Sequence, residues 1–233
     1  MEITPTPGGD ATSPRAEEIL AALDEDQRAV ALATRGPVCV IAGAGTGKTR
    51  AITHRIAYAA AIGTMDPSKV LALTFTARAA GEMRTRLRSL GVPTVAARTV
   101  HSAALKQLIY FWPTVFGGRT PDLMNSKTPF LTEAVKRADL ANEIRITSRE
   151  TMRDIATEIE WAKVSQVAPI DYLDQVSARQ VKPRVKAEHI AAIYVAYESL
   201  KKQELAIDFE DVLLLTSATV SYTHLRAHET KAN

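Results

Sequence analysis

The sequence holds a single cysteine, Cys39, among its 233 residues, so no disulfide can form within the chain. One unpaired thiol is typical of a reducing compartment, and we expect an intracellular, cytoplasmic protein. No apolar run approaches the ~20 residues that a membrane-spanning helix needs. The N-terminus also lacks the basic and then apolar pattern of a secretory signal. These absences predict a protein without membrane association.

Acidic residues are nearly absent between positions 78 and 119, where seven Lys or Arg residues accompany one acid, Glu82. The net charge of the whole chain, +3, says little by itself. The local excess is typical of a segment that contacts a polyanion. A solvated basic helix face, balanced by acids elsewhere, explains the same charges, so charge alone leaves both interpretations open.

Short apolar runs alternate with amphipathic stretches in the first half of the chain. Asp24 with Gln27 forms a capping-box pattern, which predicts a helix start. Strands are expected at 38–42, 69–76 and 94–99, and further helices at 48–61, 77–91 and 100–112. Strands that alternate with helices predict a parallel sheet covered on both faces. Gly91 is well placed to end the helix before it.

The second half has a different texture. No convincing strand occurs between Pro129 and Glu210. One helix is expected to begin at the capping pattern of Thr147 with Glu150, and a second covers "VKAEHIAAIYVAYESLKKQE". This half therefore reads as an all-helical part that is attached to, or inserted into, the α/β part.

The two ends of the chain are not expected to belong to the fold. Residues 1–16 are rich in Pro, Gly, Thr and Ser, which predicts disorder. Residues 221–233, "SYTHLRAHETKAN", show no apolar periodicity and resemble translated sequencing-adapter read-through, so we interpret them as a non-native tail. Two histidines four residues apart in this tail have the spacing of metal ligands on a helix but no supporting context.

A glycine-rich loop follows the expected strand at 38–42 and opens the expected helix at 48–61. It consists of Ala42, Gly43, Ala44, Gly45, Thr46, Gly47, Lys48 and Thr49. Glycines leave backbone N–H groups bare and allow positive φ, so that these groups can converge on phosphate oxygens beside a helix N-terminus. Lys48 is expected to reach the β- and γ-phosphates, and the Thr49 hydroxyl to ligate Mg²⁺. The loop therefore predicts binding of a nucleoside triphosphate, against the alternative of a chance Gly-Lys-Thr in a tight turn.

Four stretches around this loop occur in a fixed order: "LDEDQRAV", "AGAGTGKTR", "LALTFTARAAGEMRTRL" and "ARTVHSAAL". Together they resemble the N-terminal half of superfamily 1A DNA helicases, the UvrD/PcrA/Rep group. "ARTVHSAALKQLIYFWP", "EIEWAKV" and "AIDFEDVLLLT" resemble most the second, UvrD-type helicase of actinobacteria. The resemblance covers about residues 23–217. It implies a helicase that uses ATP and Mg²⁺, moves 3′ to 5′ on single-stranded DNA and acts at junctions of single- and double-stranded DNA.

Two residues correspond to nucleotide contacts in that family. Gln27 corresponds to the Q-motif glutamine, whose amide both donates to and accepts from an adenine edge. Arg50 corresponds to an arginine that lies beside the base. By residue type alone, Gln27 suits a capping box and Arg50 suits an exposed helix surface, so both roles come from the resemblance.

The resemblance also implies contacts to single-stranded DNA from two motifs. The corresponding residues are Thr74, Phe75, Thr76, Arg78, Thr99 and His101. Hydroxyl groups and arginine donate to phosphates, and an exposed ring packs against a base or sugar. The chain departs from the family where Ala77-Arg78 replaces Asn-Lys and Val100 replaces Phe, which removes a polar contact and a stacking contact. A position of Phe75 in the core under the sheet is the alternative.

Two further clusters have structural explanations. The aromatic residues 110–112 lie at a helix end. We expect them to pack in the core, with DNA stacking as the second interpretation. Asp208, Glu210 and Asp211 have the composition of a metal or acid–base site. Acids in a first helical turn also complement the helix dipole, and we assign them a structural role.

The resemblance implies an α/β P-loop NTPase fold of the RecA-like type, with an incomplete parallel sheet and an inserted all-helical subdomain. Residues 17–115 correspond to the first part of domain 1A, 116–207 to helical subdomain 1B, and 208–220 to the segment that returns to 1A. The family holds Mg²⁺ and orients the attacking water with a strand ending in Asp-Glu, followed by Gln-Asp, and this run is missing here. We expect an N-terminal fragment that binds ATP without hydrolysing it.

Three other functions stay open from the sequence. A P-loop enzyme of another class, such as a small-molecule kinase, uses the same loop, although the basic helix at 77–91 argues against it. A DNA-binding module without nucleotide chemistry is the second. The third is a helicase–nuclease subunit within the same family. Oligomeric state is not encoded in any pattern we identify.

Overall fold

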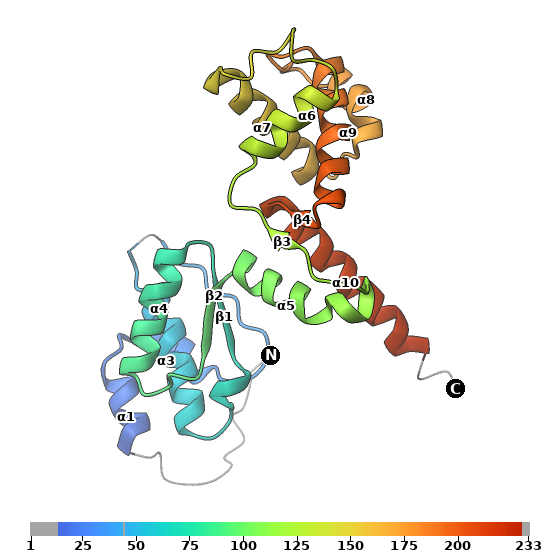
Figure 1. Cartoon of the computed structure of the whole chain (residues 1–233). Helices are drawn as coiled ribbons and strands as arrows, with labels where there is room; N and C mark the ends of the chain where they lie inside the picture. The colour runs from blue at the N-terminus through green and yellow to red at the C-terminus, as the bar shows by residue number, and fades with distance from the viewer. Residues whose placement is uncertain (1–13, 44, 230–233) are drawn as a thin grey trace. The chain divides into compact units, whose positions relative to one another are not determined.

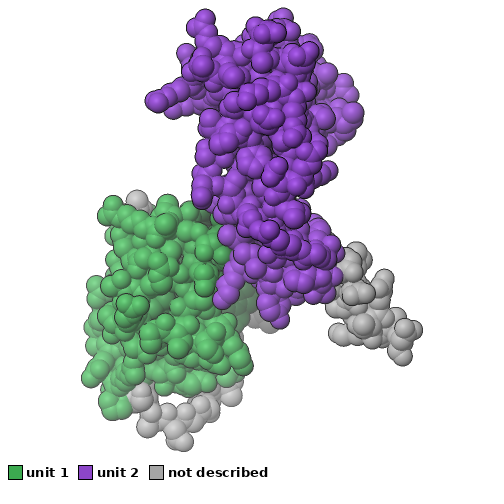
Figure 2. Space-filling model, in the orientation of Figure 1, with its two compact units in different colours: residues 1–103 green, residues 104–233 purple. Residues whose placement is uncertain are grey.

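The computed structural model describes residues 14–43 and 45–229, with side chains described as far as residue 220. Two compact units divide the chain, residues 1–103 and 104–233 (Figure 2). Residues 1–13, which are predicted to be disordered, lie outside the described part. The same prediction is wrong for residues 14–16, which begin a helix because Ala16 is fully buried in the core of unit 1.

Unit 1 contains helices and one short parallel sheet (Figure 1). Its elements are α1 (Pro14–Ala21), α2 (Glu25–Leu32), α3 (Lys48–Ala61), η1 (Pro67–Lys69), β1 (Leu71–Thr74), α4 (Ala77–Ser89) and β2 (Ala96–Thr99). The helix start predicted at Asp24 is confirmed, because the Asp24 side chain accepts a hydrogen bond from the Gln27 backbone N–H at 2.8 Å. The Gln27 side-chain amide donates to Thr46 O at 3.3 Å. Helix α3 packs against α1, α2 and α4, which places the segment after the glycine loop in the core.

Hydrogen bonds close both ends of α4. At its start, Thr76 Oγ1 accepts from the Ala79 N–H at 3.1 Å. At its end, the Gly91 N–H donates to Arg88 O at 3.0 Å and the Val92 N–H donates to Leu87 O at 2.9 Å. This pair of bonds is the Schellman motif, and the positive φ of Gly91, 75°, allows it. The predicted role of Gly91 as the helix terminator is confirmed.

Strands β1 and β2 pair in parallel, with Leu71 opposite Ala96 and Thr74 opposite Thr99. Ala72 and Ala97 are buried on the face that α4 covers. Leu71 and Leu73 alternate with Ala72 and stay 51% and 48% exposed. The parallel pairing is thus confirmed, whereas the prediction of a sheet covered on both faces is wrong for this face of β1.

The predicted strand at 38–42 is wrong. Residues 37–43 have no regular secondary structure, and Ile41 is 96% exposed. A strand requires ladder hydrogen bonds to a neighbour, and β1 pairs only with β2 among the described residues. The β-branched composition of this run favours a strand, but it does not supply the partner.

Unit 2 is mostly helical, as predicted for the second half of the chain. Its elements are the main part of α5 (Val100–Val115), β3 (Asp122–Leu123), α6 (Thr128–Arg137), α7 (Arg149–Val164), η2 (Pro169–Asp171), α8 (Tyr172–Ser177), α9 (Ala187–Gln203), β4 (Ala206–Ile207) and α10 (Phe209–Glu229). Helix α9 packs against α6, α7 and α8 (Figure 1). It buries Ile190, Ile193 and Tyr197 in the largest core. None of the described helices is long and apolar enough to span a bilayer.

Three local predictions in unit 2 need correction. Helix α7 is capped by Ser148, whose Oγ accepts from the Thr151 N–H at 3.2 Å, and not by Thr147. Strand β4 lies within the stretch predicted to have no strand, and it pairs in parallel with β3 over two residues. Helix α5 continues through Pro113 to Val115.

The division into units differs from the predicted boundary at 115/116. Leu108 of α5 packs in one small core with Ile207 and Val212, so most of α5 belongs to the same unit as the start of α10. Helix α10 extends through residue 229 and includes most of the predicted non-native tail. The side chains of residues 221–233, including both tail histidines, lie outside the described residues.

We expect Gly91→Ala to destabilise unit 1 more than Gly63→Ala does. Both glycines have positive φ, 75° and 71°, so a Cβ strains each by about 1 kcal/mol. Only at Gly91 does the Arg15 side chain occupy the place of the new Cβ, from where it donates to Leu90 O at 3.1 Å. Urea unfolding followed by far-ultraviolet circular dichroism should show roughly 1 kcal/mol more loss for Gly91→Ala. Equal losses in the two variants would contradict this packing.

Candidate nucleotide and nucleic-acid site

The glycine loop turns sharply into α3. Gly45 and Gly47 both have φ of 81°, in the left-handed region that favours glycine. Gly47 is the residue that immediately precedes the helix, and no side chain caps the helix start. The first N–H groups of α3 are therefore left for another acceptor, which is the arrangement that binds phosphate.

The loop is held by its own side chains. The Lys48 ammonium donates to Ala42 O at 2.9 Å and to Gly43 O at 2.5 Å. The Thr46 hydroxyl donates to Gly43 O at 2.9 Å. Lys48 thus folds back over the loop, and its exposed ammonium has only neutral carbonyl partners among the contacts of this loop. The Lys48 ammonium and the first N–H groups of α3 fit a polyphosphate, because phosphate oxygens are stronger acceptors for an ammonium than carbonyl oxygens are.

Gln27 lies directly over the loop. Its side-chain amide donates to Thr46 O at 3.3 Å. A Cβ at position 47 would lie 2.5 Å from Gln27 Nε2, so only glycine allows this approach. The structure therefore brings together the Q-motif position and the glycine loop, 20 residues apart in sequence, as the resemblance implies.

The remaining residues predicted to contact nucleotide are placed as follows. Arg50 points to the connector after α1, where its guanidinium donates to Ala22 O at 2.5 Å. Thr49 is half-buried in the first turn of α3, and its carbonyl accepts from Thr53 Oγ1 at 2.9 Å. Ala44 lies outside the described residues.

A cleft of about 840 Å³ lies between α2 and the segment that leads into the loop. Its polar and charged lining consists of Gln27, Thr46 and Lys48 together with Asp24 and Asp26, and Val30 and Val38 are among its apolar residues. A volume of this size suits a nucleotide. Val30 lines this cleft but is not among the predicted contacts, although it lies three residues after Gln27 on one helix face.

The predicted DNA-contacting residues meet at the carboxyl ends of β1 and β2. Thr74 and Thr99 lie opposite each other in the last register pair of the sheet. Phe75 follows β1 and is 93% exposed, so its alternative position in the core is wrong. Arg78 is also exposed and pairs with Glu82 at 3.1 Å, a contact that contributes little at a surface.

Two of the threonines also form hydrogen bonds at the starts of helices. Thr76 Oγ1 caps α4, and Thr99 Oγ1 accepts from the Ser102 N–H at 3.1 Å at the start of α5. Their residue types are therefore explained without a ligand. His101 is half-buried in the first turn of α5. Thr74 and Thr99 are half-buried too, whereas Phe75, Thr76 and Arg78 are exposed.

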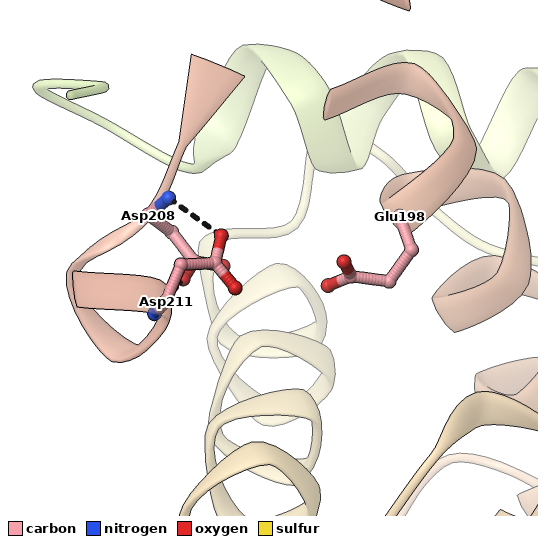
Figure 3. Close-up of side chains that lie close together, drawn as sticks. All are labelled: Glu198, Asp208 and Asp211. Atoms are coloured by element: carbon pink, nitrogen blue, oxygen red, sulfur yellow. Dashed lines mark hydrogen bonds between the residues drawn. The ribbon is translucent and has the colours of Figure 1, made fainter. Parts of the chain in front are cut away.

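A separate cluster of acids lies in unit 2. Carboxylate oxygens of Glu198, Asp208 and Asp211 come within 4.8 Å of one another, close enough for a metal ion (Figure 3). Two lysine ammonium groups occupy the space between them. Lys163 lies 2.6 Å from Asp208 and 2.5 Å from Asp211, and Lys201 lies 2.6 Å from Asp211 and 2.8 Å from Glu198. The protein's own lysines therefore balance two of the three negative charges.

The cluster also closes the first turn of α10. The Asp211 N–H donates to Asp208 Oδ1 at 2.9 Å, and the Asp208 N–H donates to Asp211 Oδ2 at 3.0 Å. These reciprocal bonds form a capping box. Lys127 adds a second link, because it lies 2.6 Å from both Glu160 of α7 and Glu210 of α10. These contacts support the structural role predicted for Asp208, Glu210 and Asp211.

Burial and charge act in opposite directions on this cluster. Burial by itself raises the pKa of Asp208, but Lys201 and Lys163 hold that pKa well below its usual range. Burial by itself lowers the pKa of Lys163, but Asp208, Glu198 and Asp211 raise it above its usual range. Burial and the Asp208 carboxylate also raise the pKa of Tyr197, whose hydroxyl donates to Asp208 at 3.0 Å. The ionised forms of Asp208 and Lys163 thus stabilise each other.

Residues 23–232 match the family described as the UvrD/REP helicase N-terminal domain. The chain is 46% identical over 215 residues to the ATP-dependent DNA helicase UvrD2 of Mycobacterium tuberculosis (strain CDC 1551 / Oshkosh), with 88% of this chain and 30% of that protein covered. It is 30% identical over 205 residues to the ATP-dependent DNA helicase PcrA of Leuconostoc citreum, with 86% and 26% covered. The chain thus spans less than a third of the length of these relatives.

We expect Lys163→Met to lower the free energy of unfolding of unit 2 by about 3 kcal/mol, since it leaves buried carboxylates with one cation fewer. Lys202→Met, on the same helix as Lys201 but exposed, is the matched control and should change stability little. Urea unfolding followed by tryptophan fluorescence measures the difference, because Trp112 and Trp161 both lie in unit 2. A loss below about 1 kcal/mol for Lys163→Met would contradict a stabilising cluster.

The same unfolding experiment at several pH values tests the charges. Because the folded-state pKa of Asp208 lies below its unfolded value, its contribution is complete above about pH 5 and is lost as pH falls further. The pKa of Lys163 is raised, so its contribution is complete at neutral pH and is lost only in strong alkali. The acid loss should be steeper in the parent chain than in Lys163→Met. Parallel curves below pH 5 would argue against the pairing.

Proposed function

Because this chain belongs to the UvrD/REP helicase family through its N-terminal domain, we propose that it is the N-terminal part of an ATP-dependent DNA helicase. The intact protein would translocate 3′ to 5′ on single-stranded DNA and separate the duplex at junctions. The chain spans about 30% of its UvrD2 relatives, which supports the interpretation as a fragment of a longer motor. A cytoplasmic location is part of the proposal and is supported by the single cysteine.

The glycine loop is the observation that carries the proposal. Positive φ at Gly45 and Gly47, the uncapped start of α3 and the adjacent Lys48 form a cradle for phosphates. In this cradle, Lys48 would exchange its carbonyl partners for β- and γ-phosphate oxygens, and Gln27 would read the adenine edge at the cleft wall. Arg50 would lie beside the base. Bound Mg²⁺, with the Thr49 hydroxyl as a ligand, would neutralise charge on the phosphates.

The nucleic-acid part of the proposal rests on the carboxyl edge of the sheet in unit 1. Phe75 offers an exposed ring for a base or sugar, and Arg78 offers a cation for a phosphate. Thr74, Thr76 and Thr99 line the same edge as hydroxyl donors, and His101 follows in α5. The basic, acid-poor composition around these residues supports a polyanionic partner.

Coupling of ATP to DNA would use parts that this sequence does not contain. Hydrolysis in this family depends on an Asp-Glu strand end and on arginine fingers of a second motor domain, and no Asp-Glu followed by Gln-Asp occurs among the 233 residues. In the intact motor, closure of two RecA-like domains over the nucleotide would advance the single strand. Residues 116–207 are proposed as the helical subdomain 1B and 208–220 as the segment that returns to domain 1A.

We expect Lys48→Ala to abolish saturable binding of a fluorescent ATP analogue with Mg²⁺, because no other ammonium lies on the loop. Lys69→Ala, whose side chain is 83% exposed on η1, is the matched control and should bind as the parent does. Fluorescence titration gives both affinities. Adding poly-dT should change the affinity of the parent for nucleotide. An unchanged affinity favours a small-molecule kinase, and undetectable nucleotide binding by a folded parent chain favours a DNA-binding module.

We also expect the 233-residue chain to lack ATP turnover, with or without single-stranded DNA, because the hydrolytic carboxylates are missing. Phosphate release measured over time with saturating ATP and poly-dT tests this. A steady rate that rises severalfold on adding DNA would defeat the fragment interpretation, while leaving the nucleotide site itself intact.

A further inference from the structure

Helix α5 has two different faces within unit 2. On one face, Leu108 is 1% exposed and Trp112 packs against the same small core. The opposite face is open to solvent and consists of Lys106, Gln107, Ile109 and Tyr110, followed by Pro113 and Thr114. The 3.6-residue helical period puts Lys106 and Tyr110, four residues apart, side by side on this open face.

Tyr110 is the most exposed aromatic residue on this face. Its side chain is 75% exposed, whereas Phe111 and Trp112 are partly buried. The ring of Phe111 supports it edge to face, with centroids 4.9 Å apart and planes at 89°. Trp112 packs instead against Phe116, with centroids 4.4 Å apart. Core packing therefore explains Trp112, while Phe111 is partly buried and supports the exposed ring of Tyr110.

Helix α5 carries a positive charge and no acid. Lys106 is the only Lys, Arg, Asp or Glu between residues 100 and 115, so no acid of this helix opposes an anion at its surface. An exposed ring beside an unopposed cation matches the chemistry of single-stranded nucleic acid, in which bases stack on aromatic rings and phosphates contact lysine. Besides Tyr110, the only large apolar side chain on this face is Ile109, which is 50% exposed, so the face offers a protein partner little apolar area.

We propose that the exposed face of α5 in unit 2 binds single-stranded nucleic acid, with a base stacked on Tyr110 and the adjoining phosphate on Lys106. The inference rests on the proposed DNA-binding function and adds a contact site outside the sheet edge of unit 1. Stacking on one ring does not discriminate between bases, so the site accepts any sequence. Phe111 holds the ring in place before binding, which lowers the entropy lost on stacking.

The test compares two labelled ligands in anisotropy titrations with the 233-residue chain: an oligo-dT and an abasic oligonucleotide of the same length. Tyr110→Ser should weaken oligo-dT binding roughly five- to a hundredfold, the range of one lost base stack. It should leave abasic binding unchanged, because no base is present to stack. Tyr110→Phe keeps the ring and should bind as the parent. Lys106→Gln should weaken both ligands and reduce the salt dependence of binding.

Ile170→Ser is the matched control, since Ile170 is 85% exposed in the same unit and distant in sequence from α5. Circular dichroism of each variant verifies the fold. Equal affinities of Tyr110→Ser and the parent for oligo-dT, or equal loss on both ligands, would overturn this inference and leave the proposed function in place. No binding of oligo-dT by the parent would overturn both. Concentration-dependent dimers that Tyr110→Ser abolishes would assign the face to a second copy of the chain and also overturn it.

Discussion

The left-handed backbone at Gly47 is the constraint on which the nucleotide site depends. It completes the turn that Gly45 begins, leads directly into α3 and leaves the first helical N–H groups without a side-chain cap. It also brings the loop so close to Gln27 that a Cβ would lie 2.5 Å from the side-chain amide. One backbone conformation thus sets the cradle for phosphates and the position of the residue that would recognise the base. The Lys48 ammonium donates to the loop carbonyls of Ala42 and Gly43, beside the cradle proposed for the phosphates.

Unit 2 depends on a different kind of interaction. Lys163 and Lys201 place two buried cations among Glu198, Asp208 and Asp211, and two of these acids, Asp208 and Asp211, cap the first turn of α10. Because these groups come from three helices, the ion cluster fixes where α10 leaves the helical core. Two lysines face three acids, so removing either lysine leaves two carboxylates without a cation in a largely buried site.

Local signals explain most of what the sequence predicted correctly. Asp24 with Gln27, Gly91 and the glycine loop each act within a few residues, so their patterns identify helix ends without knowledge of the rest of the fold. The segment at 38–42 was predicted wrongly because a strand depends on a neighbour, which propensity does not supply. The partners of Asp208 lie 45 and 7 residues away, and no spacing rule links Lys163 to it. Gln27 lines the cleft beside the glycine loop, where residue type alone favours a surface role, and Val30 of the same helix face lines it too.

The central claim is that the bare amides around Lys48 bind a triphosphate, and hydrogen exchange of those amides tests it most directly. Exchange is measured for the backbone N–H groups of residues 45–49 in the chain alone and with excess ATP and Mg²⁺. The account predicts slower exchange at these amides on adding nucleotide, with the N–H groups of α7 and α9 in unit 2 unchanged. Identical exchange at the loop in both samples, in a chain whose helices remain protected, would contradict it.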